Sequence, residues 1–325
     1  MKKLKIKSAL LLGGLGFIGY NLSKYLIENG VDVTIIDSKN GSSGYNEFHM
    51  INLRKEKINI IEDSIGNVEK YKDQIKNTDC VVDLAALISH SDSMKNPLFD
   101  IENNTIEHIK FLEVFKSFKN KKVVYISTRQ VYGKQEKFPV DESSNVNPVD
   151  VNGINKYATE MYYSLYSRYY GFPLTILRLS NIYGEGMHIK DKRLSFIGWF
   201  LNRVITNNPI ELYSDGSTLR DLLYVKDLVR TIYNSMIVEN TGIFNVGSDY
   251  SYSLKSIAEK LVKLNPKSSI IYIPFPDEIK NIDIGSFKPD NSKAKEFLNH
   301  KEETLLDEGL KNTYEYYQKY KGYYL

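Results

Sequence analysis

The stretch SALLLGGLGFIGYNLSKYLIENGVDVTIID, residues 8–37, determines the expected fold. A short apolar run leads into a turn with glycines at 13, 16 and 19, and a helical pattern of apolar residues continues until Gly30. The stretch ends in an alternating run that is typical of a second strand. A strand, a glycine-rich turn and a helix in this order allow the backbone to approach a pyrophosphate at the helix N-terminus.

Asp37 indicates which dinucleotide would bind. It ends the second expected strand about 20 residues after the turn, where a carboxylate can bind a ribose diol and would repel a 2′-phosphate. This position favours NAD over NADP, although Lys39 is close enough to weaken the preference. The alternative is a glycine-rich turn that serves only tight packing.

The rest of the first half repeats the alternation of strand and helix. Continuous apolar strands separated by helical patterns are typical of a parallel sheet covered on both faces. We therefore predict an α/β fold with a Rossmann-type, doubly wound parallel sheet. Further strands are expected at 58–61, 80–87, 122–128 and 173–180, and helices at 97–118 and in 147–171.

The rhythm loosens after Tyr183, where shorter strands and helices follow a polar loop. We expect a dinucleotide-binding domain over 1–183 and a smaller mixed α/β substrate domain over 184–325. The segment 219–247 is expected to return to the first domain.

Composition excludes several classes of partner. The chain has 325 residues with 43 basic and 40 acidic side chains, and no run of basic residues that would bind nucleic acid. Its single cysteine, Cys80, excludes an internal disulfide, and the five histidines share no metal-ligand spacing, so no metal site is expected. The N-terminus resembles a secretory signal but lacks a cleavage site, and no stretch is long enough to span a membrane. We expect a cytoplasmic protein.

The spacing of the first three glycines resembles that of the short-chain dehydrogenase/reductase superfamily. Five later segments resemble its extended branch, the NAD-dependent epimerase/dehydratase family of nucleotide-sugar enzymes. They are LAAL (84–87), SMKNPLFDIENN (93–104), YISTRQVYG (125–133), LRLSNIYG (177–184) and YSDGSTLRDLLYVKD (213–227).

The resemblance implies roles for individual residues. Asp63 would contact the adenine, Lys156 the nicotinamide ribose, and the hydroxyl of Thr128 the reacting sugar oxygen. Asn181 and Arg220 would hold the diphosphate of a nucleotide-diphosphate sugar, for which an arginine fork is well suited. The implied cofactor contacts are Gly13, Gly16, Phe17, Ile18, Asp37, Asp63, Leu84, Ala85, Ala86, Asn104 and Lys156, and the implied catalytic positions are Thr128, Asn152 and Lys156.

Each of three roles has a simpler alternative. Thr128 could be a strand-end hydroxyl that satisfies the backbone, and Lys156 a solvated helix lysine. Arg220 could form a surface ion pair with Asp221.

Asn152 departs from the family's Y-x-x-x-K motif, which here is N-G-I-N-K. Residues four apart share a helix face, so Asn152 takes the place of the tyrosine that acts as general base. An amide cannot accept and return a proton in that way. Asn152 is a natural replacement with another group as base, an engineered inactivating change, or the mark of a protein that binds without turnover. Tyr183, Tyr132, Asp83 and His90 are conceivable bases.

Two further departures narrow the reaction. The family's 4,6-dehydratases carry Asp-Glu after the threonine and its decarboxylases usually a glutamate, whereas this chain has Arg129 and Gln130. Lys288 stands where relatives often have an arginine for the diphosphate. We therefore expect NAD-dependent oxidation at C4 of a nucleotide sugar, by a 4-epimerase. A 4-dehydrogenase that releases the ketone and a non-catalytic binding protein are the alternatives.

Relatives pair through two helices, which here correspond to 97–118 and the helix that carries Lys156. The apolar face formed by Tyr157, Met161, Leu165 and Tyr169 would allow a homodimer or higher homo-oligomer. The alternative is burial of this face against the sheet.

Overall fold

The main sheet has seven parallel strands in the order β10-β6-β5-β4-β1-β2-β3. The computed structural model describes residues 4–41 and 44–325. The order reverses between β1 and β4, as in a doubly wound sheet. The strands are β1 (Ser8–Leu12), β2 (Asp32–Asp37), β3 (Asn59–Glu62), β4 (Cys80–Asp83), β5 (Lys122–Thr128), β6 (Leu174–Leu179) and β10 (Gly242–Val246). The predicted fold class is confirmed.

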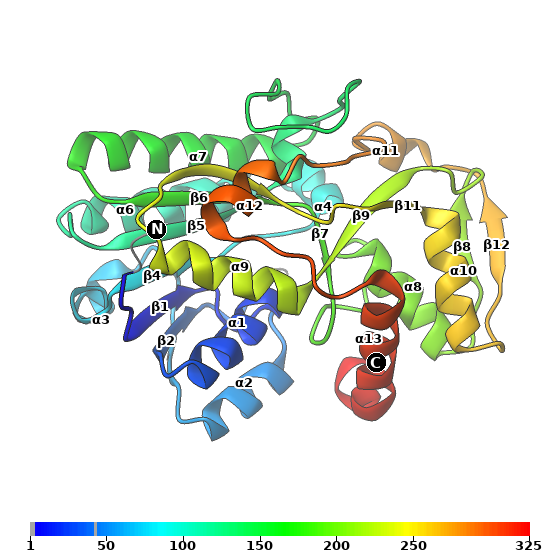
Figure 1. Ribbon diagram of the computed structural model, residues 1–325, viewed down its shortest axis with the longest axis horizontal. Coiled ribbons are helices and arrows are strands. Elements are labelled where there is room, and N and C mark those ends of the chain that lie inside the picture. The colour runs from blue at the N-terminus through cyan, green and yellow to red at the C-terminus, as the bar shows by residue number, and fades with distance from the viewer. Residues whose placement is uncertain (1–3, 42–43) are drawn as a thin grey trace.

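Helices cover both faces of this sheet (Figure 1). Alternate residues of β1 enter different cores: Leu11 belongs to the core that includes residues of α1, α9 and α12, and Leu10 and Leu12 to the core that includes residues of α3, α6 and α7. These helices are α1 (Phe17–Glu28), α3 (Lys72–Asn77), α6 (Glu107–Phe115), α7 (Val151–Tyr170), α9 (Val225–Ile237) and α12 (Ser292–Leu298), and α2 (Glu47–Lys55) lies beside α1.

Two smaller sheets and their helices extend the molecule beyond the carboxyl ends of the main strands. Their apolar residues form a separate core beneath α8 (Phe196–Ile205), α10 (Leu254–Leu264) and α13 (Leu306–Tyr324). One sheet joins β7 (Asn181–Tyr183), β9 (Leu219–Tyr224) and β11 (Ser251–Ser253), and the other joins β8 (Ile210–Tyr213) and β12 (Ile270–Ile273). Within 219–247, β9 therefore belongs to a smaller sheet, whereas β10 joins the main one.

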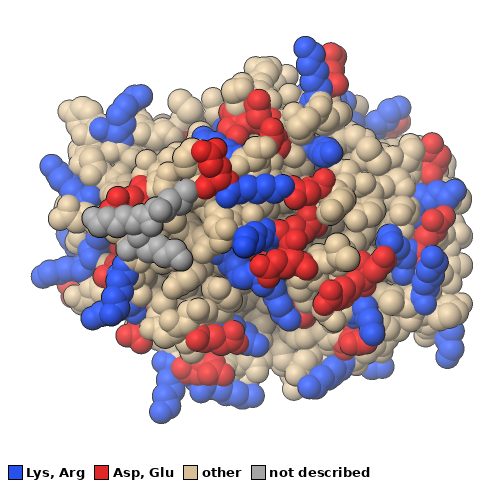
Figure 2. All heavy atoms as spheres, in the orientation of Figure 1, with Lys and Arg blue, Asp and Glu red and all other residues tan. Residues whose placement is uncertain are grey.

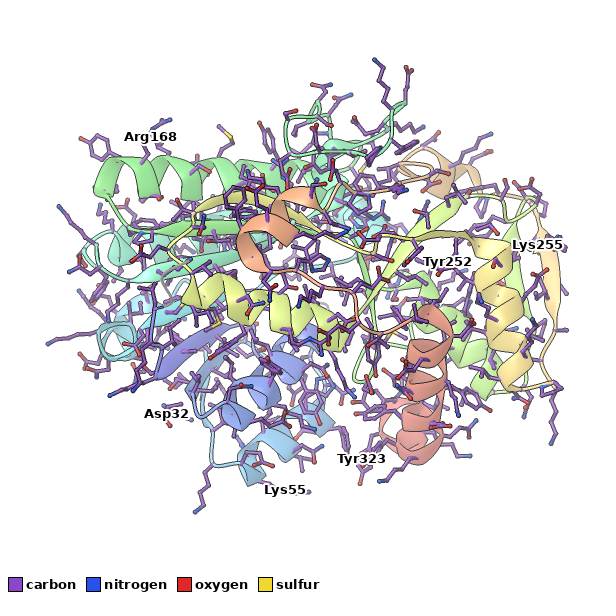
Figure 3. The ribbon with its side chains drawn as sticks, in the orientation of Figure 1. Asp32, Lys55, Arg168, Tyr252, Lys255 and Tyr323 are labelled. Atoms are coloured by element: carbon purple, nitrogen blue, oxygen red, sulfur yellow. The ribbon has the colours of Figure 1, made fainter. Side chains whose placement is uncertain are left out.

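The C-terminal helix closes back onto the first part of the chain. The ring of Tyr323 on α13 lies 4.4 Å from that of Phe48 on α2, and Nε2 of His49 lies 2.9 Å from the hydroxyl of Tyr324. Lys55 and Tyr323 mark these two helices at one edge of the molecule (Figure 3). The two groups of elements thus share a packed boundary.

Two predicted elements differ from those observed. The strand expected over 80–87 ends at Asp83, because the Asp83 carboxylate accepts the N–H of Ala85 at 3.1 Å and turns the chain. The helix expected over 97–118 consists of α5 (Pro97–Ile101), a π-helical turn (Glu102–Ile106) and α6, and ends at Phe115. The π turn is the local irregularity that periodicity cannot reveal. Short helices also lie at α4 (His90–Lys95) and α11 (Asp277–Lys280), and 3₁₀ turns at Val68–Lys70 and Arg129–Tyr132.

A buried ion pair attaches α7 to the sheet. The Glu160 carboxylate on α7 accepts two hydrogen bonds from Nε and Nη2 of Arg178 on β6, and a third from the hydroxyl of Ser127 on β5. The two charged side chains are 1% and 3% exposed. Because the pair is enclosed, each charge depends on the other.

Surface charges of both signs are mixed on the face in Figure 2, which shows no extended basic region there. No helix in the described part of the chain has the length and apolar character needed to cross a membrane.

Replacing Glu160 by alanine should lower the free energy of unfolding by about 3–5 kcal/mol, because Arg178 is left buried without its partner. Urea denaturation followed by circular dichroism measures this loss. The matched control is Glu315→Ala, which breaks an exposed pair with Lys311 and should cost at most about 1 kcal/mol. Equal losses in the two variants would contradict the structural role of the buried pair.

Candidate functional site

The glycine turn between β1 and α1 forms one end of a cavity of about 610 Å³. Gly13 has a φ of +76°, and a Cβ atom there would lie 2.8 Å from Cα of Ala85. Gly16 caps α1 without a side-chain hydrogen bond, so the first N–H groups of this helix face the turn. The turn therefore combines close backbone approach with a helix N-terminus, as a pyrophosphate requires.

Asp37 stands at the end of β2 and lines the same cavity. Its carboxylate accepts N–H groups from Leu15 at 2.9 Å and Lys39 at 2.8 Å. Burial raises the pKa of Asp37, and the two N–H groups oppose this rise. The ammonium of Lys39, which could have attracted a 2′-phosphate, instead pairs with Glu62 at 2.7 Å. These residues fit a ribose diol.

Thr128 and Lys156 line the cavity beyond this turn. Thr128 ends β5, and its hydroxyl accepts the N–H of Gln130 at 3.2 Å, so it does satisfy the backbone as well as facing the cavity. Lys156 is 4% exposed and donates to the carbonyl of Ile126 at 2.7 Å, so it is not a solvated lysine. Burial lowers the pKa of Lys156 to about 8, although Asp83, Glu160 and Asp100 oppose the change.

Asn152 also lines the cavity, but its amide nitrogen is used within the protein. It donates to the carbonyl of Leu87 at 2.7 Å and to Asp100 at 3.3 Å. Asn104 and Asn155 donate to the other oxygen of the same aspartate. Asn152 therefore belongs to a buried polar network that links α7 to the segment after β4.

The far half of the cavity is formed by the C-terminal elements. Asn181 on β7 lies there, with its amide oxygen 3.2 Å from Nη2 of Arg129. Aromatic side chains of α8 and β8, including Trp199 and Tyr213, complete the wall. The cavity thus runs from the glycine turn, past Thr128 and Lys156, to a polar and aromatic end.

Most predicted site residues line this one cavity. Asp63, Asn104 and Arg220 lie outside its wall. Asp63 accepts hydrogen bonds from Asn67 and Lys70, and Asn104 holds both backbone polar groups of Leu87. The predicted cofactor contacts on the wall are Gly13, Gly16, Phe17, Ile18, Asp37, Leu84, Ala85, Ala86 and Lys156.

Arg220 is 8% exposed, and its guanidinium pairs with Asp283 at 2.8 Å and donates to the carbonyl of Gly285. The expected alternative, a surface pair with Asp221, is therefore wrong. Asp283 itself lines the cavity, so Arg220 lies directly behind the wall.

Two cavity residues make contacts that the sequence did not indicate. Arg129 was considered only as a missing carboxylate, yet its Nη1 is buried and makes no hydrogen bond within the described residues. His90 was one of four conceivable bases, and it lies 3.1 Å from the buried Asp150. The only indication in the sequence was that Arg129 lies within a segment that resembles the family, and His90 lies between two such segments.

The described residues contain no group of three or more His, Cys, Asp or Glu side chains suited to a metal ion.

Comparisons with known proteins agree with this geometry. The family model described as "NAD dependent epimerase/dehydratase family" matches residues 9–247. A putative UDP-glucose 4-epimerase of Methanocaldococcus jannaschii is 31% identical, over 93% of this chain and 95% of its own. A UDP-N-acetyl-alpha-D-glucosaminuronate decarboxylase of Bacillus cytotoxicus is 30% identical, over 96% of this chain and 98% of its own.

The crystal structure of a UDP-glucose 4-epimerase from Thermotoga maritima, solved with UDP-glucose, superposes with a TM-score of 0.88. It is 29% identical, and the alignment covers 96% of this chain and 99% of that one. The matching family model spans most of the chain. The chain belongs to the NAD-dependent epimerase/dehydratase family.

Proposed function

We propose that the chain is a 4-epimerase that oxidises and re-reduces C4 of a nucleotide-diphosphate sugar. The observation that carries the proposal is the continuity of one cavity from the glycine turn to Asn181, past Thr128 and Lys156. NAD, when bound, supplies the hydride acceptor for C4. Because both ends open into the same space, a cofactor and a sugar can meet beside the Thr128 hydroxyl.

Separate groups of residues bind the cofactor and the substrate and orient the sugar. The turn at Gly13 and Gly16 and the Asp37 carboxylate hold the adenosine half of NAD, and Lys156 holds the nicotinamide ribose. Thr128 donates its hydroxyl hydrogen bond to the sugar oxygen. Arg129 and Asn181 face the diphosphate, with Arg220 behind them, and the side chains of Trp199 and Tyr213 offer a surface for the nucleotide base.

Arg129 and Gln130 favour epimerisation over other reactions of the family. Both stand directly after Thr128, where a dehydratase or decarboxylase needs a carboxylate, and neither side chain can act as an acid or base of that kind. Asn152 donates to Leu87 and Asp100 within the polar network, so a natural replacement would be held in place by these contacts. The 4-dehydrogenase and the non-catalytic binding protein are distinguished by experiment.

The protein also has an exposed apolar surface that supports self-association. Met161, Leu165 and Tyr169 on α7 are 54%, 47% and 78% exposed, so these three are not buried against the sheet, whereas Tyr157 is partly buried. Leu98 on the adjacent α5 is 82% exposed. Arg168 marks the end of α7, which runs along the outer edge of the molecule (Figure 3). We propose a homodimer through α7 and its neighbours, and the cytoplasmic location stays a prediction.

Incubation with NAD and UDP-glucose, followed by GDP- and dTDP-sugars, should give the C4 epimer in one of the series without net NADH. Nuclear magnetic resonance identifies the product and absorbance measures NADH. The control Lys156→Met should lose turnover, because the ammonium that orients the cofactor ribose is absent. Release of a ketone with stoichiometric NADH would instead indicate a dehydrogenase, and binding without turnover a binding protein.

Gly13→Ala should weaken NAD binding at least about tenfold, because the new Cβ meets the backbone of Ala85 and displaces the turn. Gly30→Ala is the matched control, since Gly30 has a similar φ of +73° but open space around it. Calorimetric titration with NAD measures both affinities, and thermal denaturation reports the strain that they share. The role of the turn is rejected if both variants bind NAD as the wild type does.

Leu165→Glu should convert the protein from an assembly of two or more chains to a monomer, because a charge replaces an apolar contact at the centre of the surface. Light scattering coupled to size-exclusion chromatography measures the mass. Leu305→Glu, at a 64% exposed position outside α7, is the control and should not change it. A wild-type protein that is monomeric would contradict the proposed homodimer.

A further inference from the structure

His90 and Asp150 form a histidine–carboxylate pair on the cavity wall. His90 is the first residue of α4, lines the cavity and is 36% exposed. The Asp150 carboxylate is fully enclosed, and its Oδ2 lies 3.1 Å from Nδ1 of His90. Although Nδ1 of His90 is this close to the carboxylate, the two groups are not aligned as a regular hydrogen bond. Such poor alignment is common in active sites before a ligand binds.

Asp150 is held rigidly at the start of α7. Its Oδ1 accepts the N–H of Gly153 at 2.6 Å, which caps the helix, and its Oδ2 accepts the Gln130 amide at 2.8 Å. Burial alone would raise the pKa of Asp150, but His90, the Gly153 N–H and the Gln130 amide hold it below its ordinary value. An anionic, fixed Asp150 orients the imidazole with its Nδ1 proton inward and leaves Nε2 free to accept a proton.

The pair is also fixed relative to Thr128. Gln130, which binds Asp150, donates its backbone N–H to the Thr128 hydroxyl oxygen at 3.2 Å. Asn152 lies two residues after Asp150 on α7. Asp150 is thus connected to Thr128 through Gln130, and His90, Thr128 and Asn152 line the same cavity.

The other three conceivable bases lie away from the cavity wall. Asp83 is fully buried and accepts hydrogen bonds from His108 and Tyr163. The Tyr132 hydroxyl donates to Asn245 at 2.7 Å, and Tyr183 is enclosed against Gly309. Burial raises the pKa of both tyrosines, which opposes proton loss.

We propose that His90, oriented by Asp150, accepts and returns the proton of the sugar C4 hydroxyl in place of the absent tyrosine. The proposal rests on the proposed epimerase function. In the oxidising direction the O–H bond breaks, its proton moves to Nε2 of His90, and the hydrogen on C4 leaves with its electron pair as a hydride to NAD. The carbonyl that forms at C4 is reduced in reverse, and His90 returns the same proton.

His90→Gln should lower kcat at least about 100-fold, because proton transfer by a positioned side chain contributes that much or more. KM for the sugar and the calorimetric affinity for NAD should stay within about twofold, since the side chain is half-exposed and binds neither end of the cofactor. Asp150→Asn keeps the helix cap and should lower kcat by a smaller factor with KM unchanged, as expected of a positioning residue. An unchanged kcat in His90→Gln overturns the proposal, as does a loss that appears only in KM.

Imidazole supplies a second test. In His90→Gly, added imidazole should restore part of the lost rate with saturation, because it can occupy the vacated space beside Asp150. Thr128→Val is the matched control: it also loses rate, but imidazole should not restore it, since the missing group there is a hydroxyl. Absence of rescue in His90→Gly, or equal rescue in both variants, counts against His90.

A measurement that does not depend on turnover separates this proposal from the epimerase function. In protein labelled with ¹⁵N-histidine, and with His90 assigned from the His90→Gln spectrum, saturation with NAD and UDP-glucose should shift the His90 Nε2 resonance. The buried His300, bound to Thr231 and Gly247, is the internal control and should not shift. A His90 signal that is unchanged at saturation rejects the histidine. If the signal shifts but no sugar is turned over, the contact between His90 and the ligand is supported and the epimerase function is rejected.

Discussion

The buried pair between Glu160 and Arg178 fixes the position of α7 on the sheet, and the arrangement of the site depends on that position. Lys156 lies one helical turn before Glu160, on the same side of the helix, and therefore reaches the carbonyl of Ile126 at the end of β5. Ser127, which also binds Glu160, immediately precedes Thr128. One enclosed charge pair thus sets the register between the helix that carries the lysine and the strand that carries the threonine.

The same helix carries Asn152, which takes part in a buried polar network. Asn152 stands where the resemblance implies a tyrosine, and its amide is bound to the Leu87 carbonyl and to Asp100. Three asparagines now converge on that aspartate and on the segment after β4, so each buried polar group has a partner. A tyrosine in this position could not make the two donor contacts of the amide. The observed contacts of the network therefore depend on an amide at position 152.

The strands of the main sheet could be predicted because most of them are continuous apolar runs separated by helical patterns. The run 122–128 coincides with β5, and the glycine turn with Asp37 occupies one end of the cavity, as the spacing indicated. The end of β4 could not be predicted, because it depends on the contact of Asp83 with the Ala85 N–H. Periodicity also cannot reveal the π turn at 102–106.

Contacts between distant segments were equally inaccessible from the sequence. His90 and Asp150 lie 60 positions apart, and nothing in either segment indicates that Asp150 would approach the histidine. Arg220 and its partner Asp283 are also far apart in the sequence, so the sequence indicated only the neighbouring Asp221 as a partner. Local patterns predicted which elements form, whereas the polar partners depended on how those elements pack.

The positive charge at the far end of the cavity gives the strongest physical argument for an anionic substrate. Arg129 is enclosed beside Asn181, and burial together with the nearby Arg220 lowers the pKa of Arg129 to about 10, although Asp221 and Asp283 oppose the change. The two guanidinium groups repel each other. Arg220 pairs with Asp283, whereas Nη1 of Arg129 makes no hydrogen bond in the described part of the protein. A diphosphate bound beside Arg129 and Asn181 would bring negative charge to this end of the cavity and offset the repulsion. This distribution of charge supports the proposed nucleotide-diphosphate substrate over a neutral sugar, which would bring no negative charge to Arg129.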